Sequence, residues 1–384
     1  MENLIPYGRQ YIDKKDLSAV QQSLRNEKIT TGAYVEKFEK KINQFLKCKY
    51  SVSCNSGTSA LFLAFKAIDL NKNDKVIMPS INFISSYNIA KLFGAQIFLA
   101  DVDKSTGQMT PDDIEECCKK FKLKNVKALV VMYNGGYPQN ADKFFKLKKK
   151  YGFKIIEDAC HALGAEYVFK KKIYKIGSCK HSDISTFSFH PLKTITTGEG
   201  GAFTTNDKKL YKRAELFRSH GILRNKIKHW TYKINNAGFN YRLSELNCAL
   251  GVSQLENINQ ILSKREKLKR LYISKFKSLK NIIKLPKYEK CISSNHLFLI
   301  LINFKKIKSS KNKFFLFMKN KGIYLQQHYI PIYKLISHKI AKKNFPNTEK
   351  YFEQSVSLPI HFDISVKDIN KVVKEIKNFM LLNK

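Results

Sequence analysis

The sequence predicts an α/β domain with a mostly parallel central sheet, followed by a smaller α+β domain. Short apolar strands alternate with amphipathic helices over the first two thirds of the chain, as in a parallel sheet covered on both faces. The pattern changes near residue 254, where a long charged helix begins. With 384 residues and 43% hydrophobic content, the chain is long enough for two cores. We therefore expect a large domain over residues 1–253 and a small one over 254–384.

The expected strands of the large domain are short apolar segments. They lie at 50–56, 75–80, 95–103, 126–135 and 153–160, and helical patterns at 59–70 and 85–94 separate the first three. In such sheets ligands bind at the carboxyl ends of the strands. Residues that follow these strands are therefore the first candidates for a functional site.

After residue 254 a different arrangement is expected. A helix over 254–277 leads to an isolated strand within 296–304, and two more helices follow. The last helix begins after Ser365, because "SVKD" matches a capping box and apolar residues from Val366 to Ile376 recur at helical spacing.

The chain is strongly basic, with 70 Lys and Arg against 31 Asp and Glu and a formal charge of +39. A generally lysine-rich surface and a site for a polyanion are both compatible with this charge. The first is favoured, because the basic residues are almost all lysine and are spread over every helical segment, whereas nucleic-acid-binding proteins concentrate arginine and stacking aromatics on one face. We expect no nucleic-acid partner, although a smaller anionic ligand would still be attracted.

Neither a signal peptide nor a membrane span is visible, so we expect a soluble cytoplasmic protein with no membrane partner. The eight cysteines show no C-x-x-C spacing. In a large cytosolic chain such cysteines stay reduced, and we expect no metal site.

Three motifs in the large domain carry residues that could take part in ligand binding or catalysis. In "NSGTSALFLAF", Gly57 and Thr58 stand where a strand turns into a helix, which suits an anion but also suits a plain helix N-cap. In "KIIEDACHALGA", Asp158 ends a strand and His161 follows; a carboxylate there can hold a proton on a heterocycle, or simply cap a helix.

The third motif is "STFSFHPLKTITTGEGGAF", which holds a single lysine in a lysine-rich chain. The strand delivers Lys193 into a loop of small neutral residues, where partial burial would lower the pKa of its amine and make it nucleophilic. Ser188, five residues earlier, could bind a phosphate. A phosphate cradle, a strand-end aspartate and a secluded lysine are the parts that an enzyme dependent on pyridoxal 5'-phosphate (PLP) needs.

Over nearly its full length the chain resembles the DegT/DnrJ/EryC/StrS family of nucleotide-sugar aminotransferases. The matching segments include "NSGTSAL", "EDACHALGAEY", "FSFHPLKTITTGEGGAF" and "NYRLSELNCALGVSQL". The resemblance implies the architecture of a fold-type I PLP-dependent transferase. It also implies roles at the cofactor: Lys193 bonds to the aldehyde, Asp158 pairs with the pyridine nitrogen, His161 contacts the ring hydroxyl, Phe83 stacks on the ring, and Gly57, Thr58 and Ser188 hold the phosphate.

The same resemblance implies a homodimer with shared active sites, because Asn240 in "NYR" corresponds to a residue that reaches the phosphate in the neighbouring subunit. Some family members are dehydratases with histidine in place of the reactive lysine. Lys193 argues against that branch.

Within the family, "FSFHPLKTITTGEGG" and "LQQHYIPIY" look most like the aminotransferases of pseudaminic acid biosynthesis. The implied reaction aminates a UDP-linked 4-keto-6-deoxy-N-acetylhexosamine with L-glutamate as donor. Alternatives are another nucleotide-linked 4-keto or 3-keto hexose, of the perosamine or bacillosamine type, and, more distantly, a basic nucleic-acid-binding regulator on the same scaffold. The implied substrate-binding residues are Tyr7, Lys28, Thr30, Gln326, Gln327, His328 and Tyr329.

Overall fold

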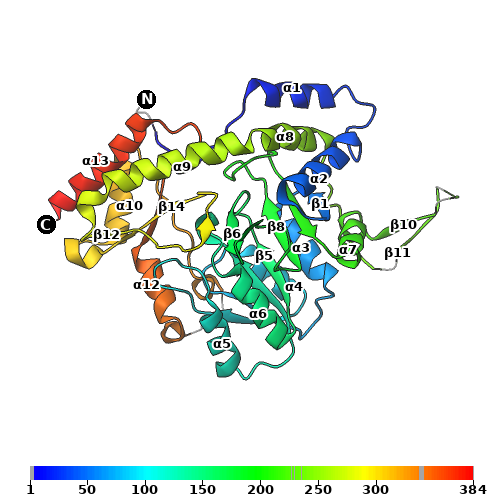
Figure 1. Cartoon of the computed structure of the whole chain (residues 1–384), viewed down its shortest axis with the longest axis horizontal. Coiled ribbons are helices and arrows are strands. Elements are labelled where there is room, and N and C mark those ends of the chain that lie inside the picture. Colours follow the sequence, from blue (N-terminus) through cyan, green and yellow to red (C-terminus); the bar gives the residue numbers. More distant parts are fainter. Residues whose placement is uncertain (1–3, 226, 229, 235, 337–340, 384) are drawn as a thin grey trace.

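A seven-stranded, mostly parallel sheet forms the centre of the molecule (Figure 1). The computed structural model describes residues 4–225, 227–228, 230–234, 236–336 and 341–383. The strands of the sheet are β1 (Tyr50–Cys54), β2 (Lys75–Pro79), β3 (Gln96–Ala100), β4 (Val126–Met132), β5 (Lys154–Asp158), β8 (Ile184–Ser188) and β9 (Gly201–Thr205). Their order is β1-β9-β8-β5-β4-β2-β3, and only β9 runs antiparallel to its neighbours. The predicted α/β class is confirmed, and the carboxyl ends of the other six strands meet at one edge.

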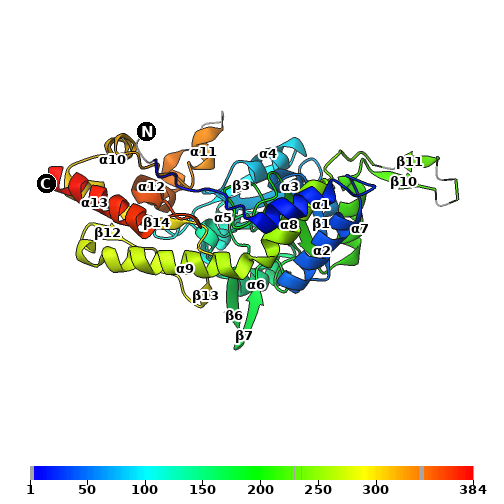
Figure 2. The same ribbon diagram turned by 90° about the horizontal axis from the view of Figure 1, so that it is seen from above.

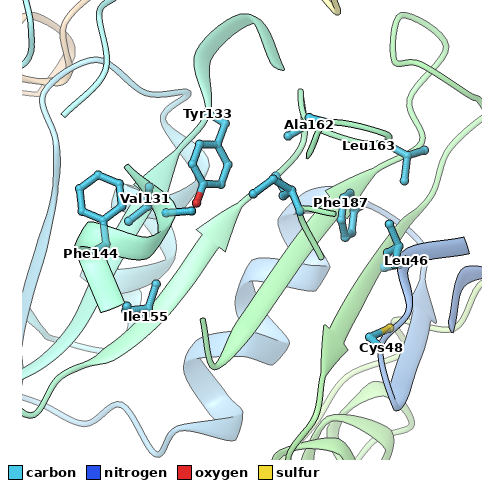
Figure 3. Close-up of a cluster of buried hydrophobic side chains, with 14 of the residues drawn as sticks. Leu46, Cys48, Val131, Tyr133, Phe144, Ile155, Ala162, Leu163 and Phe187 are labelled. Atoms are coloured by element: carbon cyan, nitrogen blue, oxygen red, sulfur yellow. The ribbon is translucent and has the colours of Figure 1, made fainter. Parts of the chain in front are cut away.

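Helices cover both faces of this sheet, because its strands alternate apolar side chains between two cores. On β4, Leu129 and Val131 pack into one core, while Ala128 and Val130 pack into the other. Figure 3 shows part of the first core, with Leu46 and Phe144 among its labelled side chains. The first face carries α2 (Ala33–Leu46), α5 (Pro111–Lys120), α6 (Ala141–Tyr151) and α8 (Glu245–Glu256); the second carries α3 (Gly57–Ala67), α4 (Ser85–Leu92) and α7 (Lys208–Arg218).

A third core lies around a small antiparallel sheet in the C-terminal part of the chain. Its strands are β12 (Ile283–Lys284), β14 (Phe298–Ile302) and β15 (Ser355–Leu358), with β14 in the centre. The predicted isolated strand is therefore paired on both sides; its partners were missed because β12 has only two residues and β15 only four. The helices of this core are α9 (Ile258–Lys275), α10 (Lys311–Asn320) and α13 (Val366–Leu382). Ser365 forms the predicted capping box at α13.

The long helix predicted over 254–277 is two helices, because α8 ends at Glu256 and α9 begins at Ile258. α9 runs from the first core, at Ile261, to the third core, at Leu268 (Figure 2). The N-terminal segment also joins the third core, since Ile5 packs there and pairs with Ile323. The domain boundary after residue 253 stays a prediction.

The remaining elements lie around these cores. A hairpin of β10 (Ile222–Arg224) and β11 (Tyr232–Ile234) projects from the end of the molecule opposite to α13 (Figure 1). Among the described residues no helix is both long and apolar enough to cross a membrane; the cytoplasmic location stays a prediction. The other helices and strands are α1 (Lys14–Ser23), β6 (Glu166–Phe169), β7 (Lys172–Lys175), β13 (Cys291–Ile292), α11 (Ile332–Leu335) and α12 (Pro346–Gln354), with 3₁₀ turns at Asn134–Gly136, Lys277–Leu279, Phe304–Ile307 and Lys342–Asn344.

Candidate active site

A cleft of about 480 Å³ opens at the carboxyl edge of the large sheet. The last residues of three neighbouring strands, Met132 of β4, Asp158 of β5 and Ser188 of β8, line it together with Lys193. This position follows from the topology, because the parallel strands end at the same edge.

One end of the cleft is built to hold an anion. Ser56 caps α3 by accepting a hydrogen bond from the backbone N–H of Ser59 at 3.0 Å, and Gly57 and Thr58 form the first turn of the helix. A Cβ on Gly57 would lie 2.8 Å from Cβ of Ser188, so only glycine allows the helix to come this close to β8. The helix dipole and free amides at this end favour a phosphate.

Asp158 lines the cleft at the end of β5 and is almost fully buried. Burial raises the pKa of its carboxyl, while hydrogen bonds with Cys160, the charge of Lys193 and a hydrogen bond with Asn82 oppose that rise. The backbone N–H of Cys160 donates to Oδ1 of Asp158 at 3.4 Å. Such a carboxylate is held in one orientation and would gain a strong partner in a protonated ring nitrogen.

Lys193 faces the same cleft from a loop that follows β8. The loop is closed on itself: the backbone N–H of Phe189 donates to the carbonyl of Gly200 at 2.7 Å, and that of Lys193 donates to the carbonyl of His190 at 2.8 Å. Burial lowers the pKa of the Lys193 amine, and the neighbouring Cys160 and Asp158 act in the opposite direction. A buried amine of this kind is easily deprotonated and can act as a nucleophile or a base.

Three buried histidines, His161, His296 and His328, surround this part of the cleft. Burial is the main cause that lowers the pKa of each ring, to about 3 for His328, and the charge of Lys193 adds to it. The rings of His161 and His296 lie 4.2 Å apart between centroids. All three imidazoles are therefore neutral near pH 7.

The tautomer of His161 follows from its partners. The backbone N–H of Gly135 donates to Nδ1 at 3.4 Å, and a backbone amide nitrogen can only donate. The proton of the neutral ring is then on Nε2, which donates to the hydroxyl oxygen of Tyr329 at 2.8 Å. Tyr329 keeps its own O–H for a ligand in the cleft. The direct contact of His161 with a cofactor hydroxyl stays a prediction.

The structure gathers most of the residues singled out in the sequence. Thr58 places its hydroxyl 3.1 Å from that of Ser85, and Phe83 exposes 54% of its surface beside the ring of Tyr329, at 5.9 Å between centroids. His161 is buried behind Tyr329. The predicted residues that line the cleft are Tyr7, Gly57, Thr58, Phe83, Asp158, Ser188, Lys193, Gln326, Gln327, His328 and Tyr329.

Four predicted residues do not line this cleft: His161, which is buried behind Tyr329, and Lys28, Thr30 and Asn240. Lys28 and Thr30 are exposed on the segment before α2, where Thr30 pairs with Ser244. Asn240 is also exposed, and its backbone carbonyl accepts a hydrogen bond from Nδ2 of Asn55 at 3.3 Å. Within one chain these three exposed side chains have no part in the cavity.

Sequence reasoning missed several residues of the cleft. Asn82 could have been found, because it follows the strand β2 as closely as Phe83 does. His296 was hidden by its place at the start of an apolar run that was interpreted only as a strand. The residues missed include Asn82, Cys160, His190, Glu199 and His296.

Known proteins share this architecture over the full length of the chain. The model of the DegT/DnrJ/EryC1/StrS aminotransferase family matches residues 10–377. The UDP-4-amino-4,6-dideoxy-N-acetyl-beta-L-altrosamine transaminase of Campylobacter jejuni is 35% identical over 97% of this chain and 96% of its own.

Solved structures agree with this match. Helicobacter pylori PseC, an aminotransferase involved in the biosynthesis of pseudaminic acid, is 28% identical with a TM-score of 0.88, covering 99% of this chain and 100% of its own. A putative sugar aminotransferase from Streptococcus pneumoniae, in its PLP form, shares the fold with a TM-score of 0.88 at 24% identity and covers 100% of both chains. The chain belongs to the DegT/DnrJ/EryC1/StrS aminotransferase family.

Proposed function

We propose that this aminotransferase moves an amino group from L-glutamate to the 4-keto carbon of a UDP-linked 4-keto-6-deoxy-N-acetylhexosamine, in the pseudaminic acid pathway. The observation that carries the chemistry is that Lys193 and Asp158 face one cleft beside the anion cradle of α3. The choice of sugar is supported by the 35% identity to the Campylobacter jejuni transaminase.

The cofactor is pyridoxal 5'-phosphate, and the residues of the cleft fit it. Because Gly57 has no side chain, the start of α3 can lie against Ser188 and still leave its backbone N–H groups accessible to a phosphate. Asp158 is the carboxylate for the ring nitrogen, Lys193 is the amine for the aldehyde, and Phe83 offers an exposed ring face in the cleft. When bound, PLP supplies an electron sink for the carbanion formed at the amino-acid carbon.

The residues of the chain supply proton transfer and orientation. The neutral amine of Lys193 takes the proton from the α-carbon of the amino acid, and in the second half of the cycle it delivers a proton to C4 of the sugar. Burial brings the pKa of Lys193 closer to the working pH, which favours both transfers. Asp158 keeps the ring nitrogen protonated. The O–H of Tyr329, freed by His161, is a donor for an oxygen in the cleft.

A homodimer with shared active sites is part of the proposal. Asn240 is exposed and lies outside the cleft of its own chain, as do Lys28 and Thr30. The hairpin of β10 and β11 projects away from the body in both views (Figures 1 and 2). It exposes 44% of Leu223, 58% of Tyr232 and 56% of Ile234, an apolar surface that a second subunit would cover.

Absorbance spectroscopy of the purified holoenzyme tests the reaction and the sugar together. We expect glutamate to convert the spectrum of the aldehyde form of the cofactor to that of the amine form, and the 4-keto-6-deoxy-N-acetylhexosamine of the pseudaminic acid pathway to reverse the change. Restoration only by a sugar of the perosamine or bacillosamine type would replace the proposed substrate. No response to any amino acid would refute transamination.

The variant Lys193→Ala tests the catalytic role directly. We expect multiple turnover to fall by at least about 10³-fold, since both the covalent attachment and the proton transfer are lost. The exposed Lys208 at the start of α7 provides a matched control, and Lys208→Ala is expected to keep full activity. Multiple turnover by Lys193→Ala at the rate of the wild type would contradict the mechanism.

A further inference from the structure

His296 lines the cleft beside Lys193 and His328, although neither the motifs nor the proposed mechanism uses it. Only 5% of its surface is exposed, so its ring is buried at the wall of the cavity. Its Nδ1 is buried and has no hydrogen-bond partner among the described residues. The lack of a partner at Nδ1 bears on which of the two ring nitrogens carries the proton.

The backbone around His296 is clamped in place. Arg265 of α9 donates from one guanidinium nitrogen to the carbonyl of His296 at 3.2 Å and to that of Ile360 at 3.0 Å. Ser294 donates to the carbonyl of His161 at 2.6 Å. The ring itself packs 4.2 Å from the ring of His161. The position of the imidazole is therefore set before any ligand arrives, which lowers the entropy cost of binding.

The ring of His296 is neutral and presents one N–H. Burial lowers its pKa well below the usual value, and the charges of Lys193 and Arg265 lower it further. A proton on Nδ1 would be a buried donor without an acceptor, and such orphan N–H groups are rarer than unpaired acceptors. The proton therefore sits on Nε2, the nitrogen left to reach a ligand in the cleft.

The two substrates of the proposed reaction make contrasting demands on this wall. The amino donor brings a carboxylate next to its reacting carbon, whereas the sugar brings neutral hydroxyl groups to the same place. A buried arginine would pair with the carboxylate of the amino donor. The same arginine would be left as an unpaired buried charge when the sugar is bound. No arginine among the residues that the structure describes lines the cleft. A neutral N–H can donate to a carboxylate and also to a hydroxyl, without leaving a buried charge unpaired in either half of the cycle.

We propose that Nε2–H of His296 binds the α-carboxylate of the amino donor, and that the same group donates to a sugar hydroxyl in the second half of the cycle. The inference rests on the proposed function and names the group that recognises the donor at that site. The α-carboxylate is chosen over the side-chain carboxylate because His296 and Lys193 line the same cleft, and the α-carbon must react at Lys193.

The test compares His296→Phe with the wild-type holoenzyme. Phenylalanine keeps the ring packing against His161 and removes the donor. By calorimetry we expect the Kd of glutarate, an unreactive dicarboxylate, to rise about tenfold or more, while the Kd of UDP changes less than about twofold. In rapid mixing with glutamate, the concentration for half-maximal conversion is expected to rise by a similar factor.

Two further variants separate binding from packing. His296→Gln keeps an N–H donor and is expected to restore part of the glutarate affinity. His361 is an equally buried histidine whose two nitrogens lack partners among the described residues, and it does not line the cleft. His361→Phe is therefore the matched control and is expected to leave both Kd values unchanged.

The outcomes distinguish this inference from the proposed function. If the wild type converts glutamate but His296→Phe binds glutarate and glutamate as tightly as the wild type, the inference alone is overturned. Arg242 follows Asn240 by two residues in "NYR", the segment that the proposed dimer brings to the neighbouring site. The inference is also overturned if Arg242→Ala weakens glutarate binding and His296→Phe does not, because an arginine of the second subunit would then bind the carboxylate. A wild type that converts no amino acid would overturn both proposals.

Discussion

At the scale of single residues, the position of Gly57 in the proposed cofactor site has no room for a side chain. A Cβ at this position would lie 2.8 Å from Cβ of Ser188 and 3.3 Å from Sγ of Cys160, so alanine would push the first turn of α3 away from β8. Overpacking of this kind costs about 1–3 kcal/mol. We expect Gly57→Ala to weaken PLP binding about tenfold or more, as measured by absorbance titration of the apoprotein.

Gly8 supplies the control for this substitution. Its Cβ would meet only the side chain of Leu192 at 3.5 Å, an ordinary van der Waals distance. Gly8→Ala is therefore expected to bind PLP like the wild type. Equal affinities of Gly57→Ala and the wild type would mean that the phosphate lies elsewhere in the cleft.

The sequence predicted residues of the cleft that stand at strand ends and missed others. Asp158 and Lys193 were found because a strand-end carboxylate and a lone lysine in a neutral loop are local patterns. His296 could not be found in this way, because its place in the cleft depends on a backbone that is held by Arg265, 31 residues earlier in the chain. The partner of His161 is farther still, since Tyr329 follows it by 168 residues.

At the scale of elements, the start of α10 places a lysine where it destabilises the fold. Burial is the main cause that lowers the pKa of Lys311 from 10.5 to about 7, with the charge of Lys334 acting in the same direction and that of Glu353 opposing it. Its ammonium also lies 4.4 Å from the ring centre of Phe352, as that of Lys334 does. Below pH 7, folding must bury a charge that the unfolded chain holds in water.

The substitution Lys311→Met removes this charge. Between about pH 7 and pH 10.5 the unfolded chain binds the proton and the folded chain releases it, so the free energy of unfolding of the wild type rises with pH. We expect the variant to gain most in stability, relative to the wild type, at or below pH 7, and to gain progressively less toward pH 10.5. Urea midpoints at several pH values measure the difference. A gain of the same size at every pH, or the same trend in the exposed neighbour variant Lys313→Met, would refute this origin.

The elements themselves were predictable where their patterns are long. The parallel strands bury both faces and read as apolar runs, and the capping box at Ser365 marks the start of α13 without ambiguity. The strands β12 and β15 were not predicted, since the first has only two residues and the second only four. Their pairing with β14 is a tertiary effect that no short window contains.

At the scale of the whole molecule, the proposed dimer decides whether the active site is complete. Asn240 cannot serve the cleft of its own chain in the described arrangement, where it is exposed and outside the lining. In a symmetric dimer the same surface is used twice, so each subunit would lend Asn240 to the other. Light scattering is expected to give twice the chain mass of 44.5 kDa.

A complementation experiment tests the sharing of sites. Lys193→Ala and Asn240→Leu are each expected to be inactive or nearly so as homodimers. After the two variants are unfolded and refolded together in equal amounts, about half of the dimers are mixed, and each mixed dimer holds one site with both Lys193 and the partner's Asn240. We therefore expect about a quarter of the wild-type activity to return. If Asn240 instead served its own subunit, no mixed dimer would hold a complete site and the activity would stay at the level of the separate variants.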